Sequence, residues 1–275
     1  MSELRVAVAQ INPSLNDLAN NFDMHKSWII KAKEISAELL VFPELSLTGY
    51  QLGRSVPNVA MQKTDERLMS LAELTEDMVC WVGFVEYAGP GEYYNAMAAL
   101  HKGQVVGVHR KLNLPTYGGL EEGKWFHQGD QVDTYRISEQ WQAACLICAD
   151  MWNPALVHCA MLKKPDILIS PANSASSIVS DDFSNERNWA VNLEFYAMIY
   201  GVPVIMANRY GPEGDAHFWG GSRILNPRGE VLAIADDKEC LISAILSIEE
   251  ISAARFDHPA IRDSNTPLIQ KLLAT

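Results

Sequence analysis

The chain has 275 residues, of which 48% are hydrophobic and 20% charged, a composition typical of ordinary globular proteins and not of disordered ones. Lys and Arg number 22 against 34 Asp and Glu, giving a formal net charge of -12. A chain this acidic, without a clustered basic face, is poorly suited to bind nucleic acid or an anionic membrane. The sequence does not open on a basic segment followed by an apolar core, and no apolar run in it is long enough to cross a bilayer. We therefore expect a cytoplasmic protein with no nucleic-acid or membrane partner.

No linker, charge block or internal repeat divides the sequence, so residues 1–275 are expected to form a single domain. Apolar segments typical of strands occur at 4–11, 38–43, 80–88, 95–101, 104–110, 141–149, 166–171 and 202–208, and residues 218–246 add short strands. Helical patterns occur at 16–36 and 186–200, and over about ten residues after Asn153. This mixture along the whole chain predicts an α/β fold. The last segment, 247–275, is polar with a Leu-rich end, and we interpret it as an arm that packs on a partner subunit.

Cys148 stands where the strand at 141–149 is expected to give way to a helix. Backbone N–H groups exposed at such a junction lower a thiol pKa and can hold an oxyanion, so Cys148 is a candidate nucleophile. A buried structural cysteine fits the same position equally well. Cys145 and Cys148 also form a C-x-x-C pair, but residues three apart on a strand point to opposite faces, and no second Cys or His pair has zinc-like spacing. A redox or metal site is therefore disfavoured, as is a disulfide framework, because the five cysteines are an odd number.

Two further candidates also lie at strand ends. Glu44 follows a buried strand and stands between Phe42 and Leu45, surroundings that suit a general base working near neutral pH. Lys111 directly follows the strand at 104–110 and could stabilise an oxyanion, although a solvated lysine is the simpler interpretation of that position alone. Among the histidines, His25 falls on the apolar face of the first helix and is expected in the core, and none is an obvious partner for Cys148.

The order of these segments is more specific than any one of them. Phe42-Pro-Glu44, then Arg110-Lys111-Leu-Asn-Leu-Pro115, then Ile147-Cys148-Ala-Asp150 resembles the nitrilase superfamily of carbon–nitrogen hydrolases. The resemblance extends over roughly residues 4–246 and includes Tyr94-Asn95, Phe126 to Asp130, Phe218 to Ser222 and Asn226 to Gly229. It implies a four-layer α-β-β-α sandwich that assembles into a homodimer or higher homo-oligomer.

The resemblance also implies roles for four residues. Cys148 would attack the carbonyl carbon, and Glu44 would take the thiol proton and later activate water. Lys111 and the backbone N–H after Cys148 would hold the oxyanion. A second glutamate of the family falls on Glu122, four residues before Phe126, in preference to Glu121. No metal or cofactor is implied.

The expected reaction is hydrolysis of a small-molecule amide to carboxylate and ammonia through a thioester. Hydrolysis of an N-carbamoyl amine is the first alternative, and nitrile hydrolysis is less favoured. Glu44 to Tyr50 and Leu114 to Gly118 are similar to the glutaminase domains of NAD synthetases, which adds an ammonia-supplying subunit as a minor alternative. An inactive scaffold is disfavoured because Glu44, Lys111 and Cys148 are all present.

Three departures from the family pattern concern specificity more than chemistry. Ala149 stands in place of an aromatic residue, Asn153-Pro154-Ala155 in place of Phe-Pro-Glu, and Ile199-Tyr200 in place of Glu-Asn. Candidate substrate-binding residues on nearby loops are Tyr117, Trp125, Trp152 and Asn173. An aromatic wall built from them would favour an apolar or flat acyl group.

Overall fold

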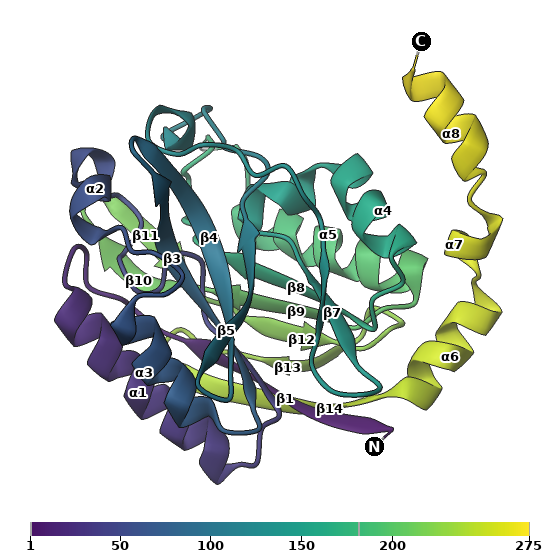
Figure 1. Cartoon of the computed structure of the whole chain (residues 1–275). Helices are drawn as coiled ribbons and strands as arrows, with labels where there is room; N and C mark the ends of the chain where they lie inside the picture. Colours follow the sequence, from purple (N-terminus) through teal and green to yellow (C-terminus); the bar gives the residue numbers. More distant parts are fainter. Residues whose placement is uncertain (1, 181, 275) are drawn as a thin grey trace.

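Two six-stranded sheets form the centre of the molecule in the computed structural model, which describes residues 2–180 and 182–274 (Figure 1). The first sheet has the order β14 (Cys240–Ser247), β1 (Glu3–Gln10), β2 (Leu39–Val41), β3 (Val79–Gly89), β4 (Glu92–His101), β5 (Gln104–Arg110). The second has the order β13 (Val231–Ile234), β12 (Arg223–Leu225), β9 (Val204–Asn208), β8 (Ile167–Ala172), β7 (Gln142–Cys145), β6 (Thr134–Arg136). A separate hairpin pairs β10 (Tyr210–Glu213) with β11 (Ala216–Trp219).

Helices cover the outer face of each sheet, so the molecule has four layers. Helices α1 (Leu18–Glu34) and α3 (Glu66–Thr75) pack on the first sheet, and α4 (Pro154–Leu162) and α5 (Asn185–Tyr200) pack on the second. The predicted α-β-β-α sandwich is confirmed. Shorter elements are α2 (Val56–Val59) and the single 3₁₀ turns η1 (Gly53–Ser55), η2 (Glu122–Lys124) and η3 (Cys148–Trp152).

Alternation of side chains along the strands explains why the sheets stack. In β1, Val6 and Val8 enter the core between the two sheets, whereas Ala7 and Ala9 face α1. Successive strand residues point to opposite faces, so a strand that is apolar at every position is buried on both sides. The same division is seen in β2, β3, β8 and β9, which explains why these strands are mostly apolar.

The sequence predicted most of the longer elements to within a few residues, but not β6, β10, α2 or the helices of the segment 247–275. Two further differences concern the end of β7 and the helix α3. The strand expected at 141–149 ends at Cys145, because Cys148 has a positive φ of 44° and opens the turn η3. The helix α3 was not predicted, although Leu68, Leu71, Ala72 and Thr75 give it a buried face with helical spacing. None of these differences changes the order of the layers.

From β14 of the first sheet the chain continues through α6 (Ile248–Asp257), α7 (Ala260–Asp263) and α8 (Thr266–Leu273). Figure 1 shows α8 standing away from the sheets and their helical layers. In the described part of the chain no helix combines the length and apolarity needed to cross a membrane.

Candidate active site

The loop after β2 places Glu44 deep in the molecule. Its neighbour Leu45 has a φ of 46°, a left-handed conformation that turns the chain sharply after the strand. The turn packs so closely on β3 that a Cβ added at Gly83 would lie 2.3 Å from the Leu45 nitrogen and 2.6 Å from the Pro43 oxygen. The position therefore requires glycine. It leaves the Glu44 carboxylate fully buried where strand ends from both sheets meet.

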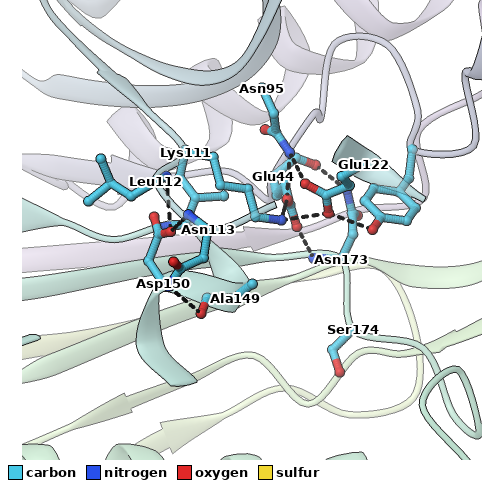
Figure 2. Close-up of polar contacts among 12 residues, drawn as sticks. Glu44, Asn95, Lys111, Leu112, Asn113, Glu122, Ala149, Asp150, Asn173 and Ser174 are labelled. Atoms are coloured by element: carbon cyan, nitrogen blue, oxygen red, sulfur yellow. Dashed lines mark hydrogen bonds and ion pairs between the residues drawn. The ribbon is translucent and has the colours of Figure 1, made fainter. Parts of the chain in front are cut away.

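The side chain of Lys111, which directly follows β5, is fully buried between two carboxylates (Figure 2). Its Nζ lies 2.6 Å from Glu44 Oε1 and 2.6 Å from Glu122 Oε1. Asn95 of β4 donates to Glu44 Oε1 at 2.7 Å and to Glu122 Oε2 at 3.4 Å, and the Asn173 backbone N–H donates to Glu44 Oε2 at 2.8 Å. These contacts join the ends of β2, β4, β5 and β8 in one polar cluster.

Asp150 ties the Lys111 segment to the turn that carries Cys148. Its Oδ1 accepts hydrogen bonds from the backbone N–H groups of Leu112 and Asn113 at 3.0 and 2.7 Å, and its Oδ2 accepts one from Ile147 at 2.9 Å. Asp150 is fully buried, and hydrogen bonds of this kind to a charged group contribute about 1.5–3 kcal/mol each. The two segments are thus held in a fixed relation.

Cys148 is the first residue of η3 and is partly exposed, at the wall of a cavity. Its positive φ is unusual for a residue with a side chain, and such conformations are concentrated at functional sites. Cys145 is buried in the core between the sheets, and both thiols are free. The geometry thus separates the two cysteines, one facing the core and one facing a cavity.

Burial and neighbouring charges together set the pKa values of the ionisable groups in the site. Burial raises the pKa of the Cys148 thiol well above its usual value, and the negative charge of Glu44 adds to this effect while Lys111 opposes it. Burial alone would lower the pKa of Lys111, but the carboxylates of Glu122 and Glu44 outweigh it and raise that pKa. Burial raises the pKa of Glu122 to about 7, against the opposing effect of Lys111. At neutral pH the site therefore holds a protonated thiol and an ammonium group.

The second glutamate is further fixed by an aromatic hydroxyl. The Tyr50 phenol donates to Glu122 Oε1 at 2.6 Å, and burial raises the pKa of that phenol well above its usual value, so it stays a donor. The Tyr50 backbone N–H is in turn bound by Glu213, which forms a buried ion pair with Arg209. This second layer holds the loop 49–51 in place behind the cluster.

The four predicted catalytic residues are close together, but the predicted substrate-binding residues are not all at one place. Tyr117, Trp152 and Asn173 line a cavity of about 30 Å³ together with Cys148 and Glu122. Trp125 lies outside its wall, because its ring packs on an apolar cluster with Leu52 and Phe126.

Sequence reasoning missed Tyr50, Asn95 and Asp150 as parts of this cluster. Each stands within a motif that carries the family resemblance, but the sequence alone does not show which residue each of them contacts. The prediction that His25 is a core residue is confirmed: it is fully buried, bonds Asn21 O and Ser46 Oγ, and burial lowers its pKa to about 4. His158 bonds the Tyr200 hydroxyl.

The profile of the carbon-nitrogen hydrolase family matches residues 5–256. The chain belongs to this family. It is therefore an enzyme of carbon–nitrogen bond hydrolysis, and the predicted membership of the nitrilase superfamily is confirmed.

Among proteins similar to this carbon-nitrogen hydrolase is the glutamine-dependent NAD(+) synthetase of Thermotoga maritima, 28% identical over 84% of this chain and 40% of that one. The chain thus spans less than half of that relative. The N-carbamoylputrescine amidase of Arabidopsis thaliana is 28% identical over 94% of this chain and 91% of that one. An amidase from Nesterenkonia sp. AN1, solved with the acetamide moiety of fluoroacetamide added to its active-site cysteine, has the same fold with a TM-score of 0.83, 22% identity, and coverage of 98% and 96%.

Proposed function

We propose that the chain hydrolyses a small-molecule amide to carboxylate and ammonia, with Cys148 as nucleophile. The observation that supports this most is the position of the Lys111 ammonium group, held by Glu44 and Glu122 beside a cavity into which a partly exposed cysteine opens. A buried cation next to a nucleophile is suited to stabilise the negative charge that develops on a carbonyl oxygen.

In this mechanism Glu44 takes the thiol proton as Cys148 Sγ bonds the carbonyl carbon. The need for a base follows from the raised pKa of the thiol, which leaves little thiolate at neutral pH. Lys111 and the backbone N–H of Ala149 stabilise the oxyanion. The carbon–nitrogen bond then breaks, and the proton passes from Glu44 to the leaving nitrogen, which departs as ammonia. Water attacks the thioester and gives one proton to Glu44, and Glu44 returns it to the sulfur as the carbon–sulfur bond breaks.

Ammonia release from a panel of amides, combined with intact-protein mass spectrometry, tests this function. A slowly hydrolysed amide is expected to leave an acyl group on the wild-type chain at Cys148. If no amide, carbamoyl amine or nitrile gives either ammonia or an acyl adduct, the proposal is refuted and a scaffold role is favoured.

An N-carbamoyl amine amidohydrolase is the second candidate, favoured by the Arabidopsis relative, which aligns with nearly the whole chain. Glutamine hydrolysis in the same panel tests the ammonia-supplying alternative, and nitrile hydrolysis tests the third chemistry.

The hydrogen bond from Tyr50 to Glu122 predicts a shift in pH dependence. A donor to a carboxylate stabilises its ionised form, so Tyr50→Phe should raise the pKa of Glu122, already about 7. Below that pKa, Glu122 loses the charge that holds Lys111, so the acid limb of kcat/KM should move up by about one pH unit. The other groups that face Glu122 remain unchanged in this variant: Lys111, Glu44, Asn95 and Cys148.

Tyr117→Phe is the matched control for this pH profile, because Tyr117 lines the same cavity but has no hydrogen bond to Glu122 among the contacts described. It should leave the acid limb where the wild type has it. An acid limb that is the same in Tyr50→Phe and in the wild type would contradict the assigned role of Tyr50.

We also propose that the chain forms a homodimer or higher homo-oligomer and works in the cytoplasm. The outer face of α5 leaves Val191, Phe195 and Met198 about half exposed, and the C-terminal arm, described here over 247–274, exposes Leu272 and Leu273. Apolar groups gathered in this way favour burial against another chain. The five described cysteines are all free, which suits a reducing compartment.

Phe195→Asp is expected to halve the molar mass measured by light scattering after size-exclusion chromatography. A charge placed in an apolar interface is costly to desolvate, so the subunits should separate. Val106→Asp is the control, because Val106 has the same exposure of 48% but lies on β5, away from α5. Equal masses for the wild type and Phe195→Asp would contradict this interface.

A further inference from the structure

The cavity at Cys148 is closed on one side by two loops that pack against each other. The backbone N–H of Gly119 donates to the Ile178 carbonyl at 2.9 Å. A Cβ added at Gly118, whose φ is +60°, would lie 2.4 Å from the Ile178 oxygen and 2.7 Å from the Val179 oxygen. Glycine at 118 is therefore what allows this close approach. The cavity is small because the two loops pack closely, and the Ile178 side chain forms part of its wall.

The rest of the wall is also well fixed. The Trp152 ring packs edge-on against Trp189 with the centroids 5.1 Å apart, and against Phe183 at 5.9 Å. The volume of about 30 Å³ corresponds to about two or three water positions, since one water needs about 10–15 Å³ by the same measure. This space fits a short acyl chain beyond the carbonyl carbon and not a long one.

The described residues of the lining offer no free counter-charge for a charged substrate group. Its residues are mostly apolar or aromatic, and Glu122 is its one ionisable carboxylate among the residues described, already bound by Lys111 and Tyr50. Among the residues that the structure describes, the lining contains no Arg, Lys or His. A substrate ammonium or carboxylate inside this cavity would lose its water without gaining a counter-charge, which is strongly unfavourable.

Most polar lining groups are engaged with the protein, and among the described residues Asn173 Oδ1 is buried without a hydrogen-bond partner. Asn173 Nδ2 donates to the Glu44 carbonyl at 2.7 Å, and Asn185 Nδ2 donates to the Ala175 carbonyl. Ser174 Oγ accepts from the indole N–H groups of Trp189 and Trp219, both at 3.0 Å. These bonds leave few groups able to recognise a polar acyl chain.

We infer that the substrate is an amide with a short, uncharged acyl group, and that the cavity selects against amino-acid amides and aminoalkyl ureas. This inference rests on the proposed amide hydrolysis and specifies its substrate. Such a cavity would disfavour the substrates in the names of the relatives. Glutamine carries an ammonium and a carboxylate, and N-carbamoylputrescine carries an ammonium group.

Matched pairs of substrates distinguish the effect of substrate charge on kcat/KM from the effect of chain length. Glutamine is compared with pentanamide, which has the same chain without the charges, and N-carbamoylputrescine with N-pentylurea. For glutamine, kcat/KM is expected to be at least about 100-fold below that of pentanamide, because its charges enter the cavity unpaired. Pentanamide should in turn be about 10-fold or more below propionamide, because its chain exceeds the cavity. A glutamine or N-carbamoylputrescine rate equal to or above that of its neutral counterpart would overturn the inference.

Ile178→Ala removes part of the wall and gives a second measurement. The ratio of kcat/KM for pentanamide to that for propionamide should rise by about 10-fold, because the space of several methylene groups is added. Ile30→Ala is the control, since Ile30 is 51% exposed on α1, outside the site. An unchanged ratio in Ile178→Ala would contradict the assigned wall. If none of these compounds releases ammonia, and propionamide leaves no adduct on Cys148, the proposed function itself fails, an outcome distinct from hydrolysis with the opposite selectivity.

Discussion

Cys148→Ala is expected to lower kcat/KM for any amide substrate by about 10⁴-fold or more, because it removes the atom that forms the covalent bond. The fold should be retained, since the side chain is small and partly exposed, and the free energy of unfolding should change by about 1 kcal/mol or less. The measurements are ammonia release, denaturant unfolding and the loss of the acyl adduct from the mass spectrum.

Two other cysteines serve as controls for this variant. Cys159→Ala alters an exposed thiol on α4 and should change neither activity nor stability. Cys145→Ala alters a fully buried thiol three residues before Cys148, and should lower stability while keeping the acyl adduct. Activity of Cys148→Ala within about tenfold of the wild type would exclude the covalent mechanism, because a removed nucleophile cannot be replaced by its neighbours.

Lys111→Met is expected to abolish activity and also to destabilise the fold by about 3–5 kcal/mol, because it leaves two buried carboxylates without their shared cation. The destabilisation should depend on pH. Without the ammonium group the pKa of Glu122 rises further above its unfolded value, so the unfolded chain releases a proton that the folded chain retains. Stability of the variant should therefore decrease as the pH rises from about 4.5 towards the raised pKa of Glu122.

The double variant Lys111→Met/Glu122→Gln distinguishes charge from packing. Removing one carboxylate should restore part of the lost stability without restoring activity, because the oxyanion still lacks its cation. Lys124→Met is the matched control, since its ion pair with Glu121 is exposed and such pairs contribute about 1 kcal/mol or less. Equal unfolding free energies for Lys111→Met and Lys124→Met would contradict the buried position of Lys111.

The fold was predictable mainly because its strands are buried on both faces. Continuous apolar runs such as residues 79–85 of β3, separated by helical patterns, indicate stacked layers before any contact is known. The α3 helix was missed because its apolar face is short and follows a polar segment, and only packing on α1 and β4 reveals its role. The end of β7 was missed because the positive φ of Cys148 is imposed by surrounding structure and not by the identity of the residue.

The candidate site was predictable in its members but not in its connections. Glu44, Lys111 and Cys148 could be found because their order along the chain is specific. The hydrogen bond of Tyr50 to Glu122 spans 72 positions, and no pattern of spacing predicts it. The same holds for Trp125, whose aromatic character suggested a cavity wall although it packs on the apolar cluster that contains Leu52. Side-chain direction in a loop depends on contacts that a single sequence does not contain.

The three backbone groups bound by Asp150 have a consequence for how the enzyme loses its structure. Leu112 and Asn113 cannot detach from the carboxylate without leaving a buried anion that is still bound to Ile147, so partial opening is costly. The segments of Lys111 and Cys148 should therefore open as one cooperative unit, and their amides should exchange hydrogen for deuterium at a common rate. Denaturation would then abolish activity in a single step. No molecule would have lost the Lys111 segment while it kept the Cys148 segment, or the reverse.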